Sequence, residues 1–235
     1  MKKTTPITIL AAIALGFWAG YASAQTQTYD NSLRAGIYII KYNVKADDIQ
    51  GPFVPPGTNL DVNDTNTLYL AYARRINKDW DVELAFGNPP KTETVGKGPA
   101  TLGSAPYDGQ VLATAKWFSP SLLLQYKFLE ESSAWRPYVG VGVNFTHFYD
   151  IQPTDAGNAA TGGPTTLKLT NSFGPAVNVG VAWHIDGPWH AYASYNYAKV
   201  KSDATLTTAG IVRTTTINFN PSAIVLSVGY SFKDW

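Results

Sequence analysis

Three histidines, His147, His184 and His190, are the side chains in this sequence from which a metal site or a general base would have to come. His184 and His190 flank the short segment 186–188, whereas His147 lies at the opposite end of a predicted strand. A weak metal contact between His184 and His190 is one interpretation. Histidines that are hydrogen-bonded locally are the favoured one, so we predict neither a metal nor a cofactor.

Catalysis would require a nucleophile paired with a base. The sequence contains no Gly-x-Ser-x-Gly elbow and no phosphate-binding Walker pattern. A hydrolase or acyltransferase built on a barrel would need a serine or aspartate beside a histidine at the outer rim, where only His147 is expected. We therefore predict that the protein is not an enzyme and has no catalytic residues.

The N-terminus has the features of an export signal. Lys2 and Lys3 precede an apolar run over residues 7–18, and Ala22-Ser23-Ala24 forms a small-residue cleavage site. The run is shorter than the roughly 20 residues that a helix needs to span a bilayer. We expect residues 1–24 to be a signal peptide cleaved after Ala24, and residues 25–235 to be the mature domain. An uncleaved anchor is the alternative.

Composition narrows the class of the mature chain. Loss of Lys2 and Lys3 reduces the 18 basic residues to 16, against 17 acidic ones, so no basic surface for nucleic acid is expected. The exported chain has no cysteine to form stabilising disulfides. Closed backbone pairing in a membrane would stabilise it instead, and abundant aromatic and glycine residues suit such a barrel.

Strict alternation of apolar and small or polar residues predicts strands in which the apolar residues face lipid. In one such strand Val139, Val141 and Val143 face outward, and we expect arginine at Val141 to impair insertion and serine at Gly142 to be milder. Seven similar rows bring the total to eight strands. The outward rows begin near Leu33, Leu68, Trp80, Leu122, Val177, Trp189 and Ile224.

Short and long connections alternate along the chain, as in outer-membrane barrels. The short ones are residues 77–79, 129–134 and 186–188, and the long ones are residues 43–66, 88–109, 150–168 and 199–210. The pattern predicts an all-β fold: an eight-stranded antiparallel transmembrane β-barrel with short periplasmic turns, long extracellular loops and both termini in the periplasm. A soluble sandwich or lipocalin-like barrel is the alternative, but it would direct its apolar rows inward.

Three groups of residues are candidates for function. An aromatic girdle at the periplasmic interface is predicted at Trp80, Trp135, Trp183 and Trp189. The inward rows give a candidate lumen lining of Tyr138, Asn144, Asn178, Tyr192, Ser194 and Asn196. An apolar cluster in the first long loop, which could bind a solute or lipopolysaccharide or pack on the barrel mouth, comprises Ile49, Phe53, Val54, Pro55 and Pro56. Few charged residues face inward, namely Arg34, Arg75, Glu83 and Lys127.

Several segments in order along the chain resemble the OmpW family of outer-membrane proteins, which includes AlkL-type importers. They are Arg34-Ala35-Gly36, Ser119-Pro120-Ser121-Leu122, the run from Arg136 through Asn144 to Asp150, Leu167-Lys168-Leu169, Ser172-Phe173-Gly174, Val179-Gly180-Val181 and Gly229-Tyr230-Ser231-Phe232. The chain departs from the family by continuing through Lys233-Asp234-Trp235 beyond the terminal aromatic residue.

The resemblance implies a narrow barrel in the outer membrane of a Gram-negative bacterium. Its lumen would be lined by apolar side chains and would conduct small hydrophobic molecules, with release through a lateral gap between strands. Expected partners are the lipid bilayer, lipopolysaccharide, small hydrophobic solutes and the barrel-assembly machinery, and no nucleic acid. The alternative is a structural or adhesive barrel whose lumen is plugged.

Overall fold

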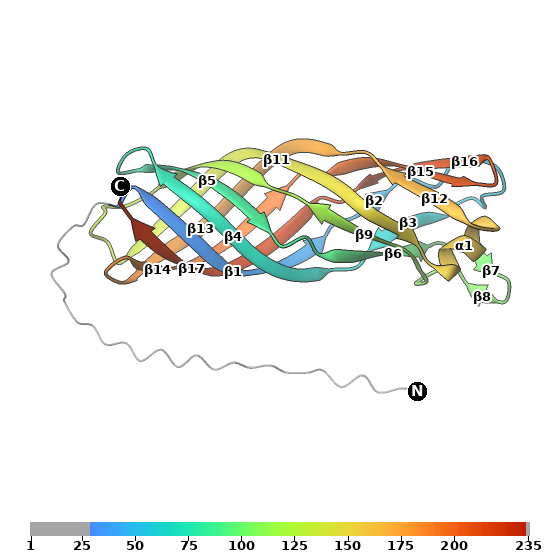
Figure 1. Ribbon diagram of the computed structural model, residues 1–235, viewed down its shortest axis with the longest axis horizontal. Coiled ribbons are helices and arrows are strands. Elements are labelled where there is room, and N and C mark those ends of the chain that lie inside the picture. The colour runs from blue at the N-terminus through green and yellow to red at the C-terminus, as the bar shows by residue number, and fades with distance from the viewer. Residues whose placement is uncertain (1–28, 234–235) are drawn as a thin grey trace, which may run out of the picture.

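A computed structural model describes residues 29–233 of the chain (Figure 1). The predicted signal peptide, residues 1–24, lies outside the described residues, as do the last two residues of the predicted C-terminal extension. Within residues 29–233, no helix combines the length and the apolar character needed to cross a bilayer.

Eight strands form a closed antiparallel barrel in which each strand pairs with its neighbours in chain order. The pairings β10–β11 and β1–β17 complete the circle, so every barrel strand has two neighbours. The predicted fold is therefore confirmed. The barrel strands are β1 (Asn31–Tyr42), β4 (Thr65–Arg75), β5 (Trp80–Gly87), β10 (Ser121–Lys127), β11 (Trp135–Pro153), β13 (Ser172–Asp186), β14 (Trp189–Ala198) and β17 (Pro221–Phe232).

The two ends of the barrel differ. Short turns join β4 to β5, β10 to β11 and β13 to β14 at the end where β1 begins and β17 stops, which we call the turn end (Figure 1). The long connections all leave from the opposite end, which we call the loop end. Both the first and the last described strand thus have their terminal residues at the turn end, as the alternation of connection lengths predicts.

The apolar rows face outward, as the alternation predicts. Val141 is 61% exposed and Val179 is 52% exposed, whereas Asn144 and Asn178 on the opposite parity are buried. A barrel whose exposed wall is a continuous band of valine, leucine, isoleucine and aromatic side chains has the surface of a protein solvated by lipid.

A glycine of β11, Gly142, lies close to the backbone of the neighbouring strand. A Cβ atom at Gly142 would overlap the carbonyl oxygen of Leu122 and lie 2.8 Å from the Cα of Leu123, both in the backbone of β10. Serine at this position would therefore push apart two paired strands. We therefore expect Gly142→Ser to damage the β10–β11 pairing. That its effect is milder than that of Val141→Arg stays a prediction.

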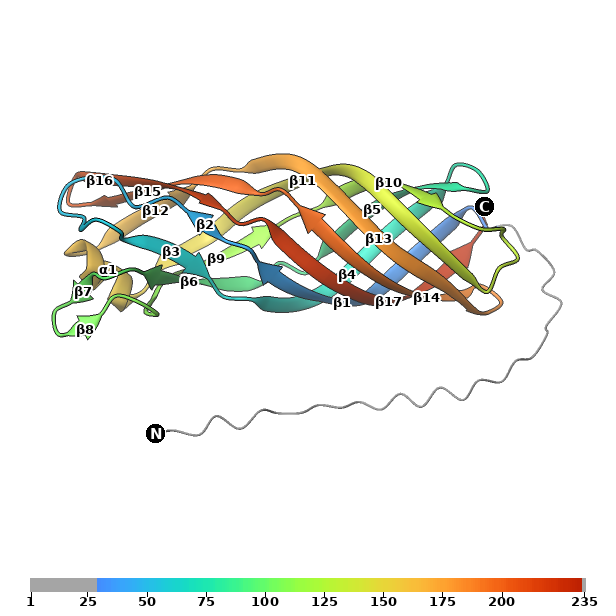
Figure 2. The same cartoon turned by 180° about the vertical axis from the view of Figure 1, so that it is seen from behind.

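The long connections continue the barrel beyond its apolar band (Figure 2). They contribute β2 (Lys45–Ala46), β3 (Asn59–Val62), β6 (Lys91–Lys97), β9 (Val111–Phe118), β12 (Thr165–Leu169), β15 (Lys201–Thr208) and β16 (Ile211–Asn218). One sheet has the strand order β3-β6-β9 and pairs through β9 with the part of β11 at the loop end. The other sheet has the strand order β12-β15-β16-β2. We call these two sheets the extension.

A short helix and a hairpin complete the extension. The helix α1 (Asp155–Thr161) begins after Thr154, whose side chain accepts a hydrogen bond from the Gly157 amide, and ends at Gly162 with φ 88°. The hairpin pairs β7 (Thr101–Leu102) with β8 (Ala105–Pro106). Both lie at the far tip of the extension, away from the barrel (Figure 1).

Candidate functional site

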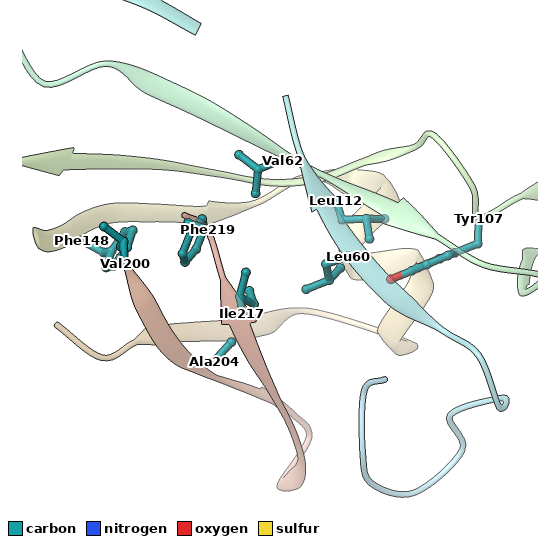
Figure 3. Packing of buried hydrophobic residues seen from close by; sticks show 9 residues of the cluster. All are labelled: Leu60, Val62, Tyr107, Leu112, Phe148, Val200, Ala204, Ile217 and Phe219. Carbon is teal, nitrogen blue, oxygen red and sulfur yellow. The ribbon is translucent and has the colours of Figure 1, made fainter. Parts of the chain in front are cut away.

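An apolar cavity of about 240 Å³ lies between the two sheets of the extension. Its wall includes a cluster of buried side chains contributed by β3, β9, β11, β15, β16 and the segments beside them. Figure 3 shows these side chains converging from different strands, namely Leu60, Val62, Tyr107, Leu112, Phe148, Val200, Ala204, Ile217 and Phe219. We call this cavity the vestibule.

The predicted loop cluster lies at the vestibule. Ile49, Phe53, Val54 and Pro55 all line it, whereas Pro56 does not. Phe53 is 85% exposed and has a left-handed backbone with φ 62°. Because its backbone is strained and its ring is largely exposed, we place Phe53 at the mouth of the vestibule and not in its core.

One polar group of the vestibule, the Tyr107 hydroxyl, forms a hydrogen bond with the backbone. It donates a hydrogen bond to the Asn59 carbonyl oxygen at 3.1 Å. Burial raises the pKa of Tyr107 well above its ordinary value, so the phenol stays neutral. The hydroxyl thus anchors the 91–111 connection to β3 without placing a charge in the apolar space.

A second, smaller cavity of about 70 Å³ lies in the barrel beneath the vestibule. Trp117, Ser119 and Pro221 line both cavities, so the two adjoin. The smaller cavity is more polar, because Asn144 and Asn196 face it. The smaller cavity therefore offers hydrogen-bonding amide side chains.

The barrel wall is interrupted beside the smaller cavity. The β5–β10 ladder ends at the pair Ala85–Ser121, and the β6–β9 ladder begins at the pair Lys91–Lys116. Between them, the described residues 86–90 and 117–120 form no ladder pair with each other. Three prolines lie in these segments, and proline has no amide hydrogen to donate to a ladder. Gly87, Asn88 and Pro90 line the smaller cavity, which thus reaches the interruption.

A buried ionic network closes the barrel near the turn end. Arg34 forms an ion pair with Glu83 and lies 3.9 Å from Asp81, which also pairs with Lys127. The Arg34 guanidinium stacks 4.0 Å over the Tyr192 ring. The side chains of Arg34, Asp81 and Glu83 are at most 5% exposed, so the network lies in the closed interior of the barrel.

The sequence predicts only part of this ionic network. The alternation predicts that Arg34, Glu83 and Lys127 face inward, and they do. The predicted inward charges do not include Asp81, although Asp81 joins two of the cations. Arg75 is different, because it pairs with Glu131 beside a turn and both side chains are partly exposed. The parity of β5 could have identified Asp81, which lies two residues before Glu83.

The predicted lumen residues all belong to inward-facing rows, at different depths. Tyr138, Asn144, Asn178 and Tyr192 are buried, and Ser194 and Asn196 are half-buried. Tyr138 and Tyr192 lie with the ionic network, whereas Asn144 and Asn196 line the smaller cavity. The apolar lining that the family resemblance implies is thus concentrated in the extension, above a smaller cavity that Asn144 and Asn196 make more polar. A role for these six residues in passage of solute stays a prediction.

The four predicted girdle tryptophans lie near the turn end. Trp135 and Trp183 stack with ring centroids 5.0 Å apart and planes 2° apart. Trp80 packs on Tyr126 at 5.0 Å, and Trp189 packs on Tyr230 at 5.1 Å. Three of the four are at least 36% exposed, as outward-facing aromatics would be, and their role as membrane anchors stays a prediction.

Two of the three histidines, His184 and His190, contact backbone oxygens of their own hairpin. His184 Nε2 lies 3.0 Å from the Gly187 carbonyl oxygen, and His190 Nδ1 lies 3.3 Å from that of Pro188. Their ring centroids are 5.1 Å apart across the hairpin, whereas His147 contacts Asn171 near the extension. Within residues 29–233, no group of three or more His, Cys, Asp or Glu side chains is placed to hold a metal ion.

Comparisons with known proteins agree with this architecture. The family model described as "OmpW family" matches residues 30–232. Outer membrane protein W of Vibrio cholerae is 32% identical, over 88% of this chain and 90% of its own length. The dibenzothiophene metabolism operon protein PahQ of Pseudomonas aeruginosa is 26% identical, over 63% of each chain. The crystal structure of OprG from Pseudomonas aeruginosa superposes with a TM-score of 0.78 at 24% identity, over 88% of this chain and 97% of that one.

Proposed function

Because the chain belongs to the OmpW family of outer-membrane β-barrels, we propose that it is a passive channel for small hydrophobic molecules, which enter from outside the cell and leave sideways into the membrane. In this orientation the turn end is periplasmic and the extension is extracellular. The observation that carries the proposal is the position of an apolar vestibule directly above a barrel that is closed below and interrupted at its side.

The vestibule supports entry of apolar solutes. Transfer of apolar surface from water is favourable by about 25 cal/mol per Å² buried, so a small aromatic molecule gains free energy by entering. A relative, PahQ, is named for a dibenzothiophene metabolism operon, and dibenzothiophene is a molecule of this class. The vestibule lies outside the apolar band of the barrel and is therefore suited to collect solute before it reaches lipid.

The ionic network and the interrupted wall support lateral release. An apolar molecule moving straight down would have to displace the buried Arg34–Glu83 pair, which would leave charges without partners. Beside the smaller cavity, the absence of ladder pairs lets side chains part without breaking hydrogen bonds between strands. The sideways route thus has the lower barrier.

Blocking the interruption is expected to slow uptake severalfold. The chain has no native cysteine, so Asn88→Cys gives a single exposed thiol at the edge of the interruption. Reaction with benzyl methanethiosulfonate would place a bulky ring there, and dithiothreitol would remove it. The measurement is uptake of naphthalene by whole cells, before labelling, after labelling and after reduction.

A matched control is Val212→Cys, which places the same thiol on an exposed position in β16, far from both edges of the interruption. Its labelling is expected to leave uptake unchanged. Equal uptake by labelled and unlabelled Asn88→Cys would argue against the lateral route, and wild-type uptake no faster than that of a strain lacking the protein would reject the channel.

Phe53→Asp is expected to slow uptake of naphthalene by about twofold, since a mostly exposed side chain contributes little apolar area to solute binding. A carboxylate at the mouth would keep that site hydrated. Barrel assembly should be unaffected because Phe53 lies outside the barrel strands. Loss confined to a charged tracer would point instead to a polar path through the Asn and Tyr residues.

One observation favours the second candidate function, a structural or adhesive barrel. The lumen is closed by the ionic network, as such a barrel would require. The two functions differ in what the vestibule does: an adhesive barrel needs no route from the vestibule to the wall, so labelling of Asn88→Cys would then have no effect on uptake.

A further inference from the structure

Arg213 is a buried cation in the wall of the apolar vestibule. It lies in β16 with 7% of its surface exposed, and its side chain lines the cavity. Its Nε atom donates a hydrogen bond to the Pro52 carbonyl oxygen at 3.0 Å, whereas its Nη1 atom is buried without a hydrogen-bond partner. Leaving a buried, charged donor unsatisfied is costly, so native structures normally supply an acceptor.

The vestibule contains no group of opposite charge to serve as that acceptor. Among the described residues that line it, none is an aspartate or a glutamate. The other charged lining residue is Lys168, which is exposed. An apolar cavity with a buried guanidinium and no carboxylate has a positive electrostatic potential. This potential favours a negatively charged ligand and gives no advantage to an uncharged one.

A second unpartnered polar group belongs to a residue of the same cavity wall. The Thr58 hydroxyl is buried, has no hydrogen-bond partner and belongs to a residue that lines the vestibule. The Thr58 carbonyl oxygen accepts a hydrogen bond from the Ile49 amide at 2.8 Å. Gln50, which follows Ile49, exchanges two backbone hydrogen bonds with Thr214. These contacts connect the Thr58 segment to the residue that follows Arg213.

We infer that the vestibule binds amphipathic monoanions: molecules with an apolar body and a terminal carboxylate, such as medium-chain fatty acids. The carboxylate accepts hydrogen bonds from Arg213 Nη1 and the Thr58 hydroxyl, and the apolar body packs on side chains such as Leu60 and Phe148. This inference rests on the proposed function, because it names a class of solute for the same cavity.

The test compares two ligands of equal chain length, octanoate and 1-octanol. Their binding to the mature protein in nanodiscs of zwitterionic lipid is measured by calorimetry, with empty nanodiscs subtracted. Wild type is expected to bind octanoate about tenfold more tightly, as a hydrogen bond to a charged group gives. The preference should vanish below about pH 4, where an alkyl carboxylate takes up its proton while arginine stays charged.

Arg213→Gln is expected to abolish the preference and to leave octanol binding unchanged. Two controls separate charge from loop structure. Lys201→Gln removes an exposed cation that does not line the vestibule and should keep the preference. Pro56→Ala changes the same loop at an exposed residue that does not line the vestibule, so it retains the guanidinium and should keep the ratio of the two affinities.

Equal affinities of wild type for octanoate and octanol, or an unchanged ratio in Arg213→Gln, would overturn the inference. Naphthalene uptake distinguishes this failure from failure of the channel itself. Uptake above that of the deletion strain without an octanoate preference rejects only the anion site. An octanoate preference without uptake rejects the channel and leaves a binding site.

Discussion

Replacement of Val141 by arginine is expected to prevent most of the chain from assembling in the outer membrane. Val141 is 61% exposed near the middle of the outward row of β11, between Trp135 and Phe145. A charged side chain facing lipid at the bilayer midplane costs roughly 2 to 4 kcal/mol, a large fraction of the stability of a single domain. The measurement is the yield of heat-modifiable, folded barrel in the outer-membrane fraction.

Val212→Arg is the matched control, because it makes the same substitution at a valine that is 50% exposed in the extension. That position is expected to face water, so the yield should be close to that of wild type. Equal loss for both variants would show that the boundary of the lipid-facing band lies further toward the loop end, and equal tolerance would contradict a lipid-facing β11.

Arg34→Met is expected to destabilise the folded barrel by about 3 to 5 kcal/mol, since removal of one partner from a buried ion pair leaves an uncompensated charge. Here Glu83 would lose its ion pair and Asp81 would keep only Lys127. The stacking of the guanidinium on Tyr192 would also be lost. The measurement is urea-induced unfolding in lipid vesicles, followed by tryptophan fluorescence.

Arg75→Met serves as the comparison, because Arg75 pairs with Glu131 while both side chains remain partly exposed. Exposed and partly exposed pairs contribute about 0 to 1 kcal/mol, so this variant should unfold close to wild type. A loss for Arg34→Met no larger than for Arg75→Met would mean that water reaches the network and that the barrel is not closed at this depth.

The sequence by itself determined the barrel. A strand that faces lipid on one side and a narrow interior on the other must alternate with period two, so rows such as Val139, Val141 and Val143 specify both the element and its orientation. The alternation of short and long connections then specified the strand order and the end at which the termini lie. These are local signals, and each can be read within about ten residues of chain.

Other features were decided only by the tertiary structure, because they depend on residues far apart in the chain. The strand that contains Arg213 has Thr215 on the same buried face and Thr214 and Thr216 on the other, so its alternation carries no hydropathy signal. The hydrogen bond between Arg213 and Pro52 joins residues that are 161 positions apart in the chain.

The vestibule and the wall interruption have the same origin. The long connections, which the sequence predicts to be loops, pair into two sheets. Which segments pair depends on the positions of the barrel strands from which they extend. Prolines 89, 90 and 120 are visible in the sequence, but only the closed barrel brings residues 86–90 opposite residues 117–120. Asp81 likewise becomes part of an ionic network only when closure brings β1, β5 and β10 around one narrow interior, where charges must find partners because water is excluded.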